Sequence, residues 1–236
     1  MPTLTDDQLA SYHAAGYVHV PEVIGLAEIG RISAEMDRVV ATVDDDKTPA
    51  GWVYAPHLRE SDISQDLARD DRLLALVERA VHPGVSLHSS KLVTKLPHSE
   101  TVCHWHQDEA FYFTGDKPQM ASRTRMSIWI PLQDTDQANG CLWVVPGSHT
   151  DGIDGYEIVG TGHCRRRIVR SDYADAHAVP LPARAGDAIL FSAYLWHHSK
   201  GNAADRSRRA FIISYQEASI PEDAYGNAAV VLRPAA

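Results

Sequence analysis

The sequence predicts a mostly β fold with flanking helices, whose core is a double-stranded β-helix, the jelly roll also seen in cupin-like proteins. Up to about residue 83 the apolar residues recur with helical spacing, whereas from residue 85 on they fall in segments of strand length. Turn-forming pairs such as Asn139-Gly140 and Pro146-Gly147 separate these segments. Many short strands after a helical lead-in are typical of an antiparallel double sheet with helices packed on one side.

The same patterns favour a single domain. We expect one unit over residues 1–236, with a helical lead-in at about 1–83 and a jelly-roll core at about 84–218. The chain contains no repeat, no low-complexity tract and no convincing linker. Its 236 residues suffice for one large domain with its own core.

The lead-in begins at a capping box, because Thr5 can cap a helix and Gln8 lies three residues further on. This helix should run to about Ala15 and end at Gly16. The next expected elements are a strand over 17–20, a helix over 26–43, a polar break over 44–49, a loop or short strand over 50–58 and a helix over 63–81. The core strands are expected near 85–96, 102–113, 125–133, 141–145, 156–160, 177–180, 187–192 and 209–217.

Composition excludes several classes of function. The net charge of −9 argues against non-specific binding to nucleic acid or to anionic membranes. No apolar run approaches the roughly 18–20 residues that span a bilayer, and the N-terminus lacks the basic and apolar regions of a secretory signal. We therefore expect a cytoplasmic protein whose partner is a small molecule. The three cysteines are widely spaced and odd in number, which fits a reducing compartment without disulfides.

The run His104-Trp105-His106-Gln107-Asp108-Glu109 concentrates two imidazoles and two carboxylates in six residues. On an extended backbone His106 and Asp108 project to the same side, whereas alternation points Cys103 away from them. A His-x-Asp pair supplies two ligands of the 2-His-1-carboxylate triad that holds non-haem Fe(II) and leaves coordination positions open. Alone, such a pair is more often solvated or hydrogen-bonded in a turn, so a distal third ligand is required.

Candidates for that ligand follow the expected strand at 187–192. Either His197 or His198 could serve, because the two side chains point in opposite directions, and from the residues alone both remain open. A single His at this place is more often an ordinary core or surface residue. Arg208 stands at the mouth of the last core strand. An Arg beside a metal can hold a carboxylate through two hydrogen bonds. The alternative is a solvated basic turn, which is the interpretation we favour for Arg206.

Taken together, these motifs resemble those of the phytanoyl-CoA dioxygenase family, a branch of the Fe(II)/2-oxoglutarate-dependent oxygenases. His106-Gln107-Asp108 is similar to the metal motif of that family, and residues 139–149 are similar to a second hallmark. His197-His198-Ser199, followed by Asn202 and Arg208, is similar to a third. The resemblance runs from about residue 4 to 217, and only the segment 151–177 matches no pattern.

The resemblance implies a cofactor set of Fe(II), 2-oxoglutarate and dioxygen (O2). It implies that the iron ligands are His106, Asp108 and His197 rather than His198. It further implies that Arg208, rather than Arg209, pairs with 2-oxoglutarate, that Ser199 and Trp129 help to hold it, and that one residue of the Ser89, Lys91, Val93 and Lys95 face also contacts it, for which we favour Lys91. The implied activity is hydroxylation of an unactivated carbon of a small metabolite of secondary metabolism, with release of succinate and CO2. Asp108 separates this chain from halogenase relatives, which carry a small residue there.

Other functions remain open at this stage. The same iron site could perform desaturation, cyclisation, epimerisation or peroxide formation. A cupin-type metal-binding or isomerase protein would use His104, His106 and Glu109, although the usual spacing places the Glu four residues after the second His, not three. A non-catalytic 2-oxoglutarate or metal sensor is a third alternative.

Substrate selection is the least determined feature. The arginines of residues 162–170, such as Arg165, could meet an anionic substrate, although a solvated basic loop is the plainer interpretation. Aromatic residues that could line an apolar pocket are Trp52, Tyr54, Trp105, Phe111 and Tyr112.

Overall fold

A computed structural model describes residues 3–40, 52–55, 62–112, 122–160 and 165–235 of the chain. The expected polar break at 44–49 and most of the segment 50–58 lie outside the described residues. None of the helices in the described part is long and apolar enough to cross a membrane.

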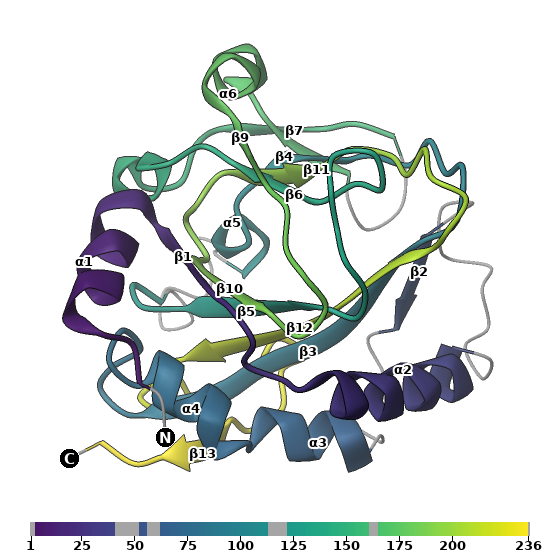
Figure 1. Cartoon of the computed structure of the whole chain (residues 1–236). Coiled ribbons are helices and arrows are strands. Elements are labelled where there is room, and N and C mark those ends of the chain that lie inside the picture. The colour runs from purple at the N-terminus through teal and green to yellow at the C-terminus, as the bar shows by residue number, and fades with distance from the viewer. Residues whose placement is uncertain (1–2, 41–51, 56–61, 113–121, 161–164, 236) are drawn as a thin grey trace.

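Two antiparallel sheets lie one above the other and confirm the expected jelly roll (Figure 1). The seven-stranded large sheet has the order β1-β10-β5-β12-β3-β13, with β2 paired to β3, and the four-stranded small sheet has the order β4-β11-β6-β9. The large sheet contains β1 (Tyr17–Val20), β2 (Trp52–Ala55), β3 (Val85–Lys95), β5 (Met126–Pro131), β10 (Ala188–Ser192), β12 (Arg208–Gln216) and β13 (Val230–Arg233). The small sheet contains β4 (Cys103–His106), β6 (Leu142–Val144), β9 (Val179–Leu181) and β11 (His197–Ser199), while β7 (Tyr156–Ile158) and β8 (Arg166–Ile168) form a separate hairpin.

The helical lead-in covers the outer face of the large sheet. Helices α2 (Leu26–Val40), α3 (Asp62–Ala68) and α4 (Asp71–Val77) lie below that sheet in Figure 1, and α1 (Asp6–Ala15) lies at its side. Alternation along β12 explains the two cores, because Phe211, Ile213 and Tyr215 join the cluster shared with the helices. Ala210 and Ile212 join the cluster between the sheets, where the cavity lies.

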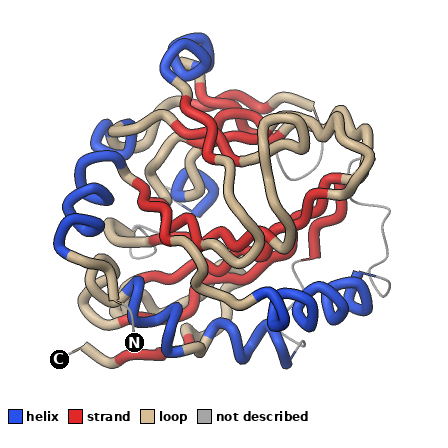
Figure 2. Tube along the Cα trace, viewed as in Figure 1, coloured by secondary structure: helices blue, strands red, loops and turns tan. Residues whose placement is uncertain are grey.

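Helix boundaries follow local chemistry. The capping box of α1 is present as expected, and Gly16 ends the helix with φ of 82°, a conformation that glycine adopts at little cost. The single helix expected over 63–81 is wrong, because α3 and α4 are separate helices (Figure 2). Asp70 leaves the helical conformation (ψ 122°) and its side chain accepts the Arg72 amide, so it starts α4 as a new helix.

The expected strand over 102–113 is also wrong in its second half. β4 ends at His106, and after two residues the chain forms the single turn α5 (Glu109–Tyr112). The elements that the sequence patterns missed are β8, β11, β13, α6 (Ser171–His177) and the 3-10 turn η3 (Ser148–Asp151).

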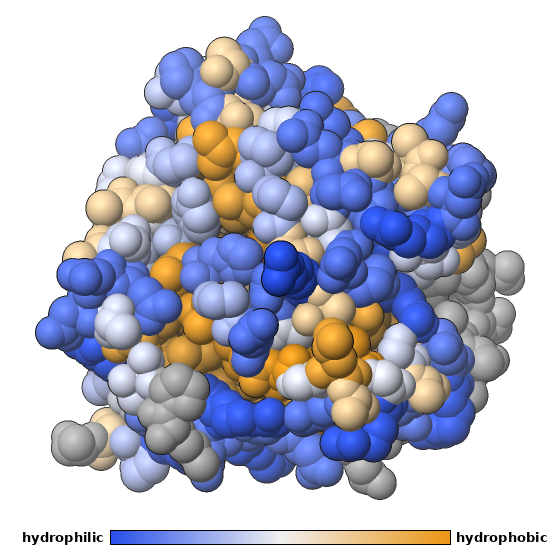
Figure 3. Space-filling view, viewed as in Figure 1, coloured by the Kyte–Doolittle hydropathy of each residue, from blue (hydrophilic) through white to orange (hydrophobic). Residues whose placement is uncertain are grey.

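On the face seen in Figure 3 the surface is largely hydrophilic, with smaller hydrophobic areas towards its centre.

Candidate active site

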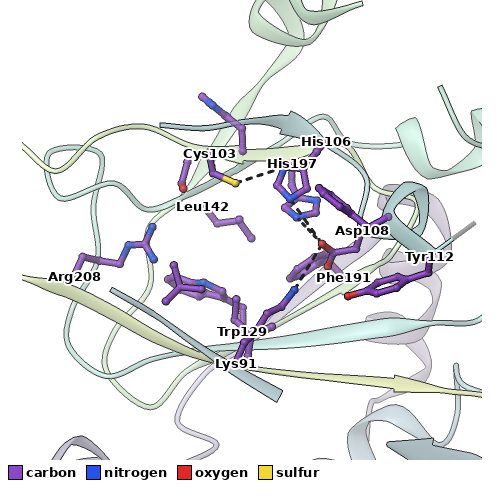
Figure 4. A pocket seen from close by; sticks show the side chains of 15 residues that line it. Lys91, Cys103, His106, Asp108, Tyr112, Trp129, Leu142, Phe191, His197 and Arg208 are labelled. Carbon is purple, nitrogen blue, oxygen red and sulfur yellow. Dashed lines mark hydrogen bonds and ion pairs between the residues drawn. The ribbon is translucent and has the colours of Figure 1, made fainter. Parts of the chain in front are cut away.

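A cavity of about 230 Å³ lies between the two sheets (Figure 4). One end holds His106, Asp108 and His197, and the Arg208 guanidinium points in from the opposite end. Both sheets contribute to its walls. The lining residues are Lys91, Val93, Cys103, His106, Asp108, Phe111, Tyr112, Trp129, Leu142, Phe191, His197, His198, Ser199, Arg208 and Ile212.

His106, Asp108 and His197 are buried and form a compact group of possible ligands. One nitrogen or oxygen atom from each lies within 4.8 Å of the others. The Nε2 atoms of His106 and His197 lie 3.7 and 3.8 Å from the same Asp108 oxygen, Oδ1. The two histidines are adjacent because His197 on β11 pairs with His106 on β4. Far-separated parts of the sequence thus bring together the three residues that the motifs singled out.

Backbone carbonyls fix both imidazole rings in the tautomer that a metal requires. His106 Nδ1 lies 2.7 Å from the His104 carbonyl oxygen, and His197 Nδ1 lies 2.9 Å from the Leu195 carbonyl oxygen. A carbonyl can only accept, so Nδ1 carries the proton and the Nε2 lone pair faces the cavity. Two Nε2 acceptors and one carboxylate then converge with no proton among them, an arrangement that suits a cation.

Charge and burial keep these groups in the forms that bind a metal. Burial lowers the pKa of His106 to about 3 and lowers the pKa of His197 as well, so both rings are neutral. Burial alone would raise the pKa of Asp108. The Lys91 ammonium, whose Nζ lies 3.9 Å from Oδ1, and the Ser127 hydrogen bond outweigh that effect and hold the pKa of Asp108 well below its usual range.

Contacts on both sides hold Asp108 in place although it lies beyond the end of β4. The Ser127 hydroxyl donates to Asp108 Oδ2 at 3.3 Å. Gln107, which separates the two ligands, is buried and binds three backbone groups: Nε2 donates to the carbonyls of Gly152 and Tyr194, and Oε1 accepts the Asp154 amide, each at 2.7 Å.

Glu109 follows Asp108 directly and anchors the other side of this turn. Its carboxylate is fully buried, pairs with Arg125 and accepts the Ser122 amide at 2.9 Å. This rules against Glu109 as the ligand of a cupin-type site, because its oxygens are already engaged. His104 is also outside the group of His106, Asp108 and His197, and only its backbone carbonyl is bonded to His106.

The opposite end of the cavity is a cationic pocket. Arg208 is 2% exposed, and its Nε donates to the Gly140 carbonyl at 3.0 Å. Its Cζ lies 5.7 Å from the centre of the Trp129 ring. Among the described residues Arg208 forms no ion pair, and burial lowers its pKa to about 10. The remaining guanidinium donors can therefore receive an anion from the cavity.

The other expected co-substrate residues share this cavity. Trp129 and Ser199 are both buried in its wall. Of the four residues on one face of β3, Lys91 and Val93 line the cavity, whereas Ser89 and Lys95 do not. His198 lies in the wall as well, but its ring stacks on Trp105 with centroids 4.1 Å apart, away from the triad.

The expectation for Cys103 is wrong in two respects. Its Sγ lies in the cavity, 3.8 Å from His106 Nδ1, because four residues of β4 (103–106) stand opposite three of β11 (197–199). This bulge shifts the alternation and turns Cys103 and His106 to one face. Cys103 is also disulfide-bonded, contrary to the prediction of no disulfides, while Cys141 is a free buried thiol and Cys164 lies outside the described residues.

The arginines of residues 162–170 have unequal surroundings. Residues 162–164 lie outside the described part, and Arg165 is exposed without lining the cavity. Arg167 pairs with Glu157, and Arg170 pairs with Asp151 and Asp154. Arg166 instead lies between the rings of Phe111 and Tyr156, 4.6 and 4.5 Å from their centres, and donates to the Ala110 carbonyl.

Aromatic residues near the triad divide in the same way. Phe111 and Tyr112 line the cavity, whereas Trp105 lies on the outer side of the small sheet and donates to Asp175 at 2.8 Å. The side chains of Trp52 and Tyr54 lie outside the described part. Sequence patterns missed Leu142 and Phe191 as wall residues. The available signal was that Leu142 lies within the hallmark segment 139–149 and that Phe191 lies on the expected apolar strand over 187–192.

Comparison with known proteins gives a consistent result. A family model described as Phytanoyl-CoA dioxygenase (PhyH) matches residues 12–210. Phytanoyl-CoA dioxygenase domain-containing protein 1 of Danio rerio is 38% identical over 116 residues, which cover 48% of this chain. They cover only 38% of that protein, so the chain spans less than half the length of this relative.

Solved structures show the same fold. The epimerase SnoN, in complex with Fe3+, alpha ketoglutarate and nogalamycin RO, superposes with a TM-score of 0.75 at 24% identity, covering 90% of this chain and 83% of SnoN. EctD from S. alaskensis with 2-oxoglutarate and 5-hydroxyectoine gives a TM-score of 0.74 at 21% identity, covering 92% of this chain and 78% of EctD.

Proposed function

The chain belongs to the phytanoyl-CoA dioxygenase family of Fe(II)/2-oxoglutarate-dependent oxygenases, and from this premise we propose that it is a dioxygenase that hydroxylates an unactivated carbon of a small metabolite, releasing succinate and CO2. One observation carries the proposal. A buried His106, Asp108 and His197 group and a buried Arg208 face each other across one cavity. The first group suits a divalent metal, and the second suits a carboxylate.

The donor set fits iron. Two imidazole nitrogens and one carboxylate oxygen form the facial triad of non-haem Fe(II) oxygenases, which leaves positions for a bidentate co-substrate and dioxygen. We assign His106, Asp108 and His197 as the ligands. When bound, iron would supply the activation of dioxygen, and 2-oxoglutarate would supply two electrons through its oxidation to succinate and CO2.

The residues of the chain bind, orient and exclude water. Arg208 holds the distal carboxylate of 2-oxoglutarate through two charge-assisted hydrogen bonds and thereby sets the direction of the 2-oxo acid end. Ser199 and Lys91 are assigned as further contacts to the co-substrate. Trp129, Leu142 and Phe191 form an apolar wall around it, so that water is kept from the reacting atoms.

The substrate enters next to Phe111, whose ring lies edge-on to His106 with centroids 5.7 Å apart. Arg166 covers the other side of Phe111 and, unlike Arg167 and Arg170, forms no ion pair with the described residues. We assign Arg166 as the group that meets an anionic substituent of the substrate. Its free donors and its aromatic support suit a carboxylate or phosphate.

The decisive experiment adds Fe(II) and then 2-oxoglutarate to the protein without oxygen. The weak visible absorption band of an iron-bound 2-oxo acid should appear for the wild type and be absent for Asp108→Ala. Succinate release in air, screened over small metabolites, then identifies the substrate. Absence of the band at saturating co-substrate would overturn the proposal, and a band without succinate release for any metabolite would indicate a sensor.

Epimerisation and cyclisation on the same site form the second candidate, supported by the fold shared with the epimerase SnoN. Isotopic oxygen separates the candidates. Hydroxylation with 18O2 places labelled oxygen in the product, whereas epimerisation, cyclisation or desaturation consumes the same co-substrate and leaves the product unlabelled.

A further inference from the structure

A second buried basic side chain, Lys95, lies beside Arg208. Lys95 is the last residue of β3, stands opposite Arg208 on β12 and is fully buried. Burial and the nearby Arg208 charge lower the pKa of Lys95 to about 6, so the neutral amine is the main form near pH 7. Groups whose pKa values are shifted this far cluster at functional sites.

The Lys95 Nζ joins the large sheet to the backbone of the small sheet. Nζ lies within hydrogen-bond distance of the carbonyl oxygens of Thr101 at 2.7 Å, Lys200 at 2.6 Å and Ser199 at 3.3 Å. The two protons of the neutral amine suit the two shorter contacts, and the third carbonyl lies close beside them. Thr101 precedes β4 and Ser199 ends β11, the two strands that carry the histidines of the triad.

Gly140 connects Lys95 to Arg208. Gly140 has φ of 81°, and a Cβ at this position would meet the Lys200 and Gly201 carbonyl oxygens at 2.8 Å and Lys95 Cδ at 3.2 Å. The Gly140 carbonyl in turn accepts the Arg208 Nε–H. Gly140 therefore packs against Lys95 and the Lys200 carbonyl, and its own carbonyl orients the Arg208 guanidinium. A substitution at Lys95 that shifts Gly140 should also shift the guanidinium.

We propose that Lys95 is a positioning residue for the distal carboxylate of 2-oxoglutarate, acting by fixing Ser199 and, through Gly140, the Arg208 guanidinium. Lys95 makes the cavity select a 2-oxo acid that carries a second carboxylate, without touching that acid itself. This inference rests on the proposed function.

The test measures selection rather than activity. 2-Oxobutanoate has the same 2-oxo acid head as 2-oxoglutarate and lacks the distal carboxylate. Both are titrated into the Fe(II)-loaded protein under argon, and the Kd of each is obtained from the visible band and from calorimetry. The measured quantity is the Kd of 2-oxobutanoate divided by the Kd of 2-oxoglutarate. For Lys95→Met, we expect this ratio to fall about tenfold, because the Kd of 2-oxoglutarate rises. The Kd values of 2-oxobutanoate and of Fe(II) should stay within about twofold of the wild type.

Thr94→Val is the matched control. Thr94 is the neighbouring buried residue on the other face of β3, and its hydroxyl has no hydrogen-bond partner among the described residues, so the ratio should be unchanged. Lys95→Gln is measured in the same way and keeps the test available if Lys95→Met does not fold. An unchanged ratio in the folded Lys95 variants would refute the inference. An equal loss of affinity for both acids would also refute it, because it indicates a purely structural role. A wild type that binds neither acid would refute the proposed function instead.

Discussion

Replacing Arg208 with Met should separate co-substrate binding from protein stability. Arg208 is buried, its Nε bonds Gly140, and among the described residues no carboxylate neutralises it. Removing one partner of a buried, hydrogen-bonded ion pair costs about 3–5 kcal/mol. At about 1.4 kcal/mol per factor of ten, the Kd of 2-oxoglutarate should rise by between roughly a hundredfold and a few thousandfold.

Stability should respond differently. The pKa of Arg208 falls from about 12.5 to about 10 on burial, so its charge costs the folded apoprotein about 3 kcal/mol. Met removes this cost and leaves the Gly140 carbonyl without its donor, which costs about 1–3 kcal/mol. The two effects offset one another, so the melting temperature of the apoprotein should stay the same or rise.

The assay combines titration of 2-oxoglutarate into the anaerobic Fe(II) protein with thermal melting of the apoprotein. Arg209→Met is the control, because Arg209 is the next residue on β12 and faces outward, where it pairs with Asp37 and donates to Ser33 at 2.7 Å. The Kd of 2-oxoglutarate for Arg209→Met should equal that of the wild type. A Kd for Arg208→Met within about threefold of the wild type would refute the assignment of Arg208.

Further predictions concern the metal, the ion pair behind it, a buried histidine and the cavity mouth. Asp108→Ala should abolish stoichiometric Fe(II) binding in equilibrium dialysis, whereas His104→Ala should retain it; the reverse result would favour the cupin-type site. Glu109→Gln breaks the buried pair with Arg125 and should lower the free energy of unfolding in urea by about 3–5 kcal/mol, and a loss below about 1 kcal/mol would contradict this account. Burial lowers the pKa of His88 well below 6.5, so below that pH the unfolded chain binds a proton that the folded chain does not, and stability falls. His88→Leu should reduce the loss of unfolding free energy from pH 7 to pH 5 by about 2 kcal/mol, and an unchanged difference would rule His88 out as its source. Once a substrate is known, Arg166→Gln should raise its KM at least about tenfold if it is anionic, whereas the paired Arg167→Gln should leave KM unchanged.

The sequence was sufficient to find the three residues that form the possible metal-ligand group, although part of the reasoning was wrong. His106 and Asp108 were expected on one continuous strand. In the structure β4 ends at His106, and Asp108 is held near it by contacts of Ser127, Gln107 and Glu109 with distant parts of the chain. Such long-range contacts leave no local sequence pattern. Strand alternation therefore predicted that Asp108 lies near His106, but not the contacts that hold it there.

Strand alternation also failed where it depends on a neighbouring strand. The bulge that turns Cys103 into the cavity arises from the register between β4 and β11, which the sequence of β4 alone does not contain. Alternation likewise places Lys91 and Lys95 on one face of β3. In the structure Lys91 lines the cavity, whereas Lys95 does not. Lys95 instead packs against Gly140 and contacts the Ser199 carbonyl, two residues that are distant from it in the sequence.

Gln107 has a consequence for anyone who wishes to re-engineer this protein for another substrate. The side chain of Gln107, between His106 and Asp108, is hydrogen-bonded to the backbone at residues 152 and 154. These residues lie at the start of the segment 151–177, which matches no pattern of the family. A loop graft from a relative should therefore keep 152–154 as its splice point and exchange only the residues after it. Grafts that cut upstream of Gly152 would disturb the metal centre even though no ligand is replaced.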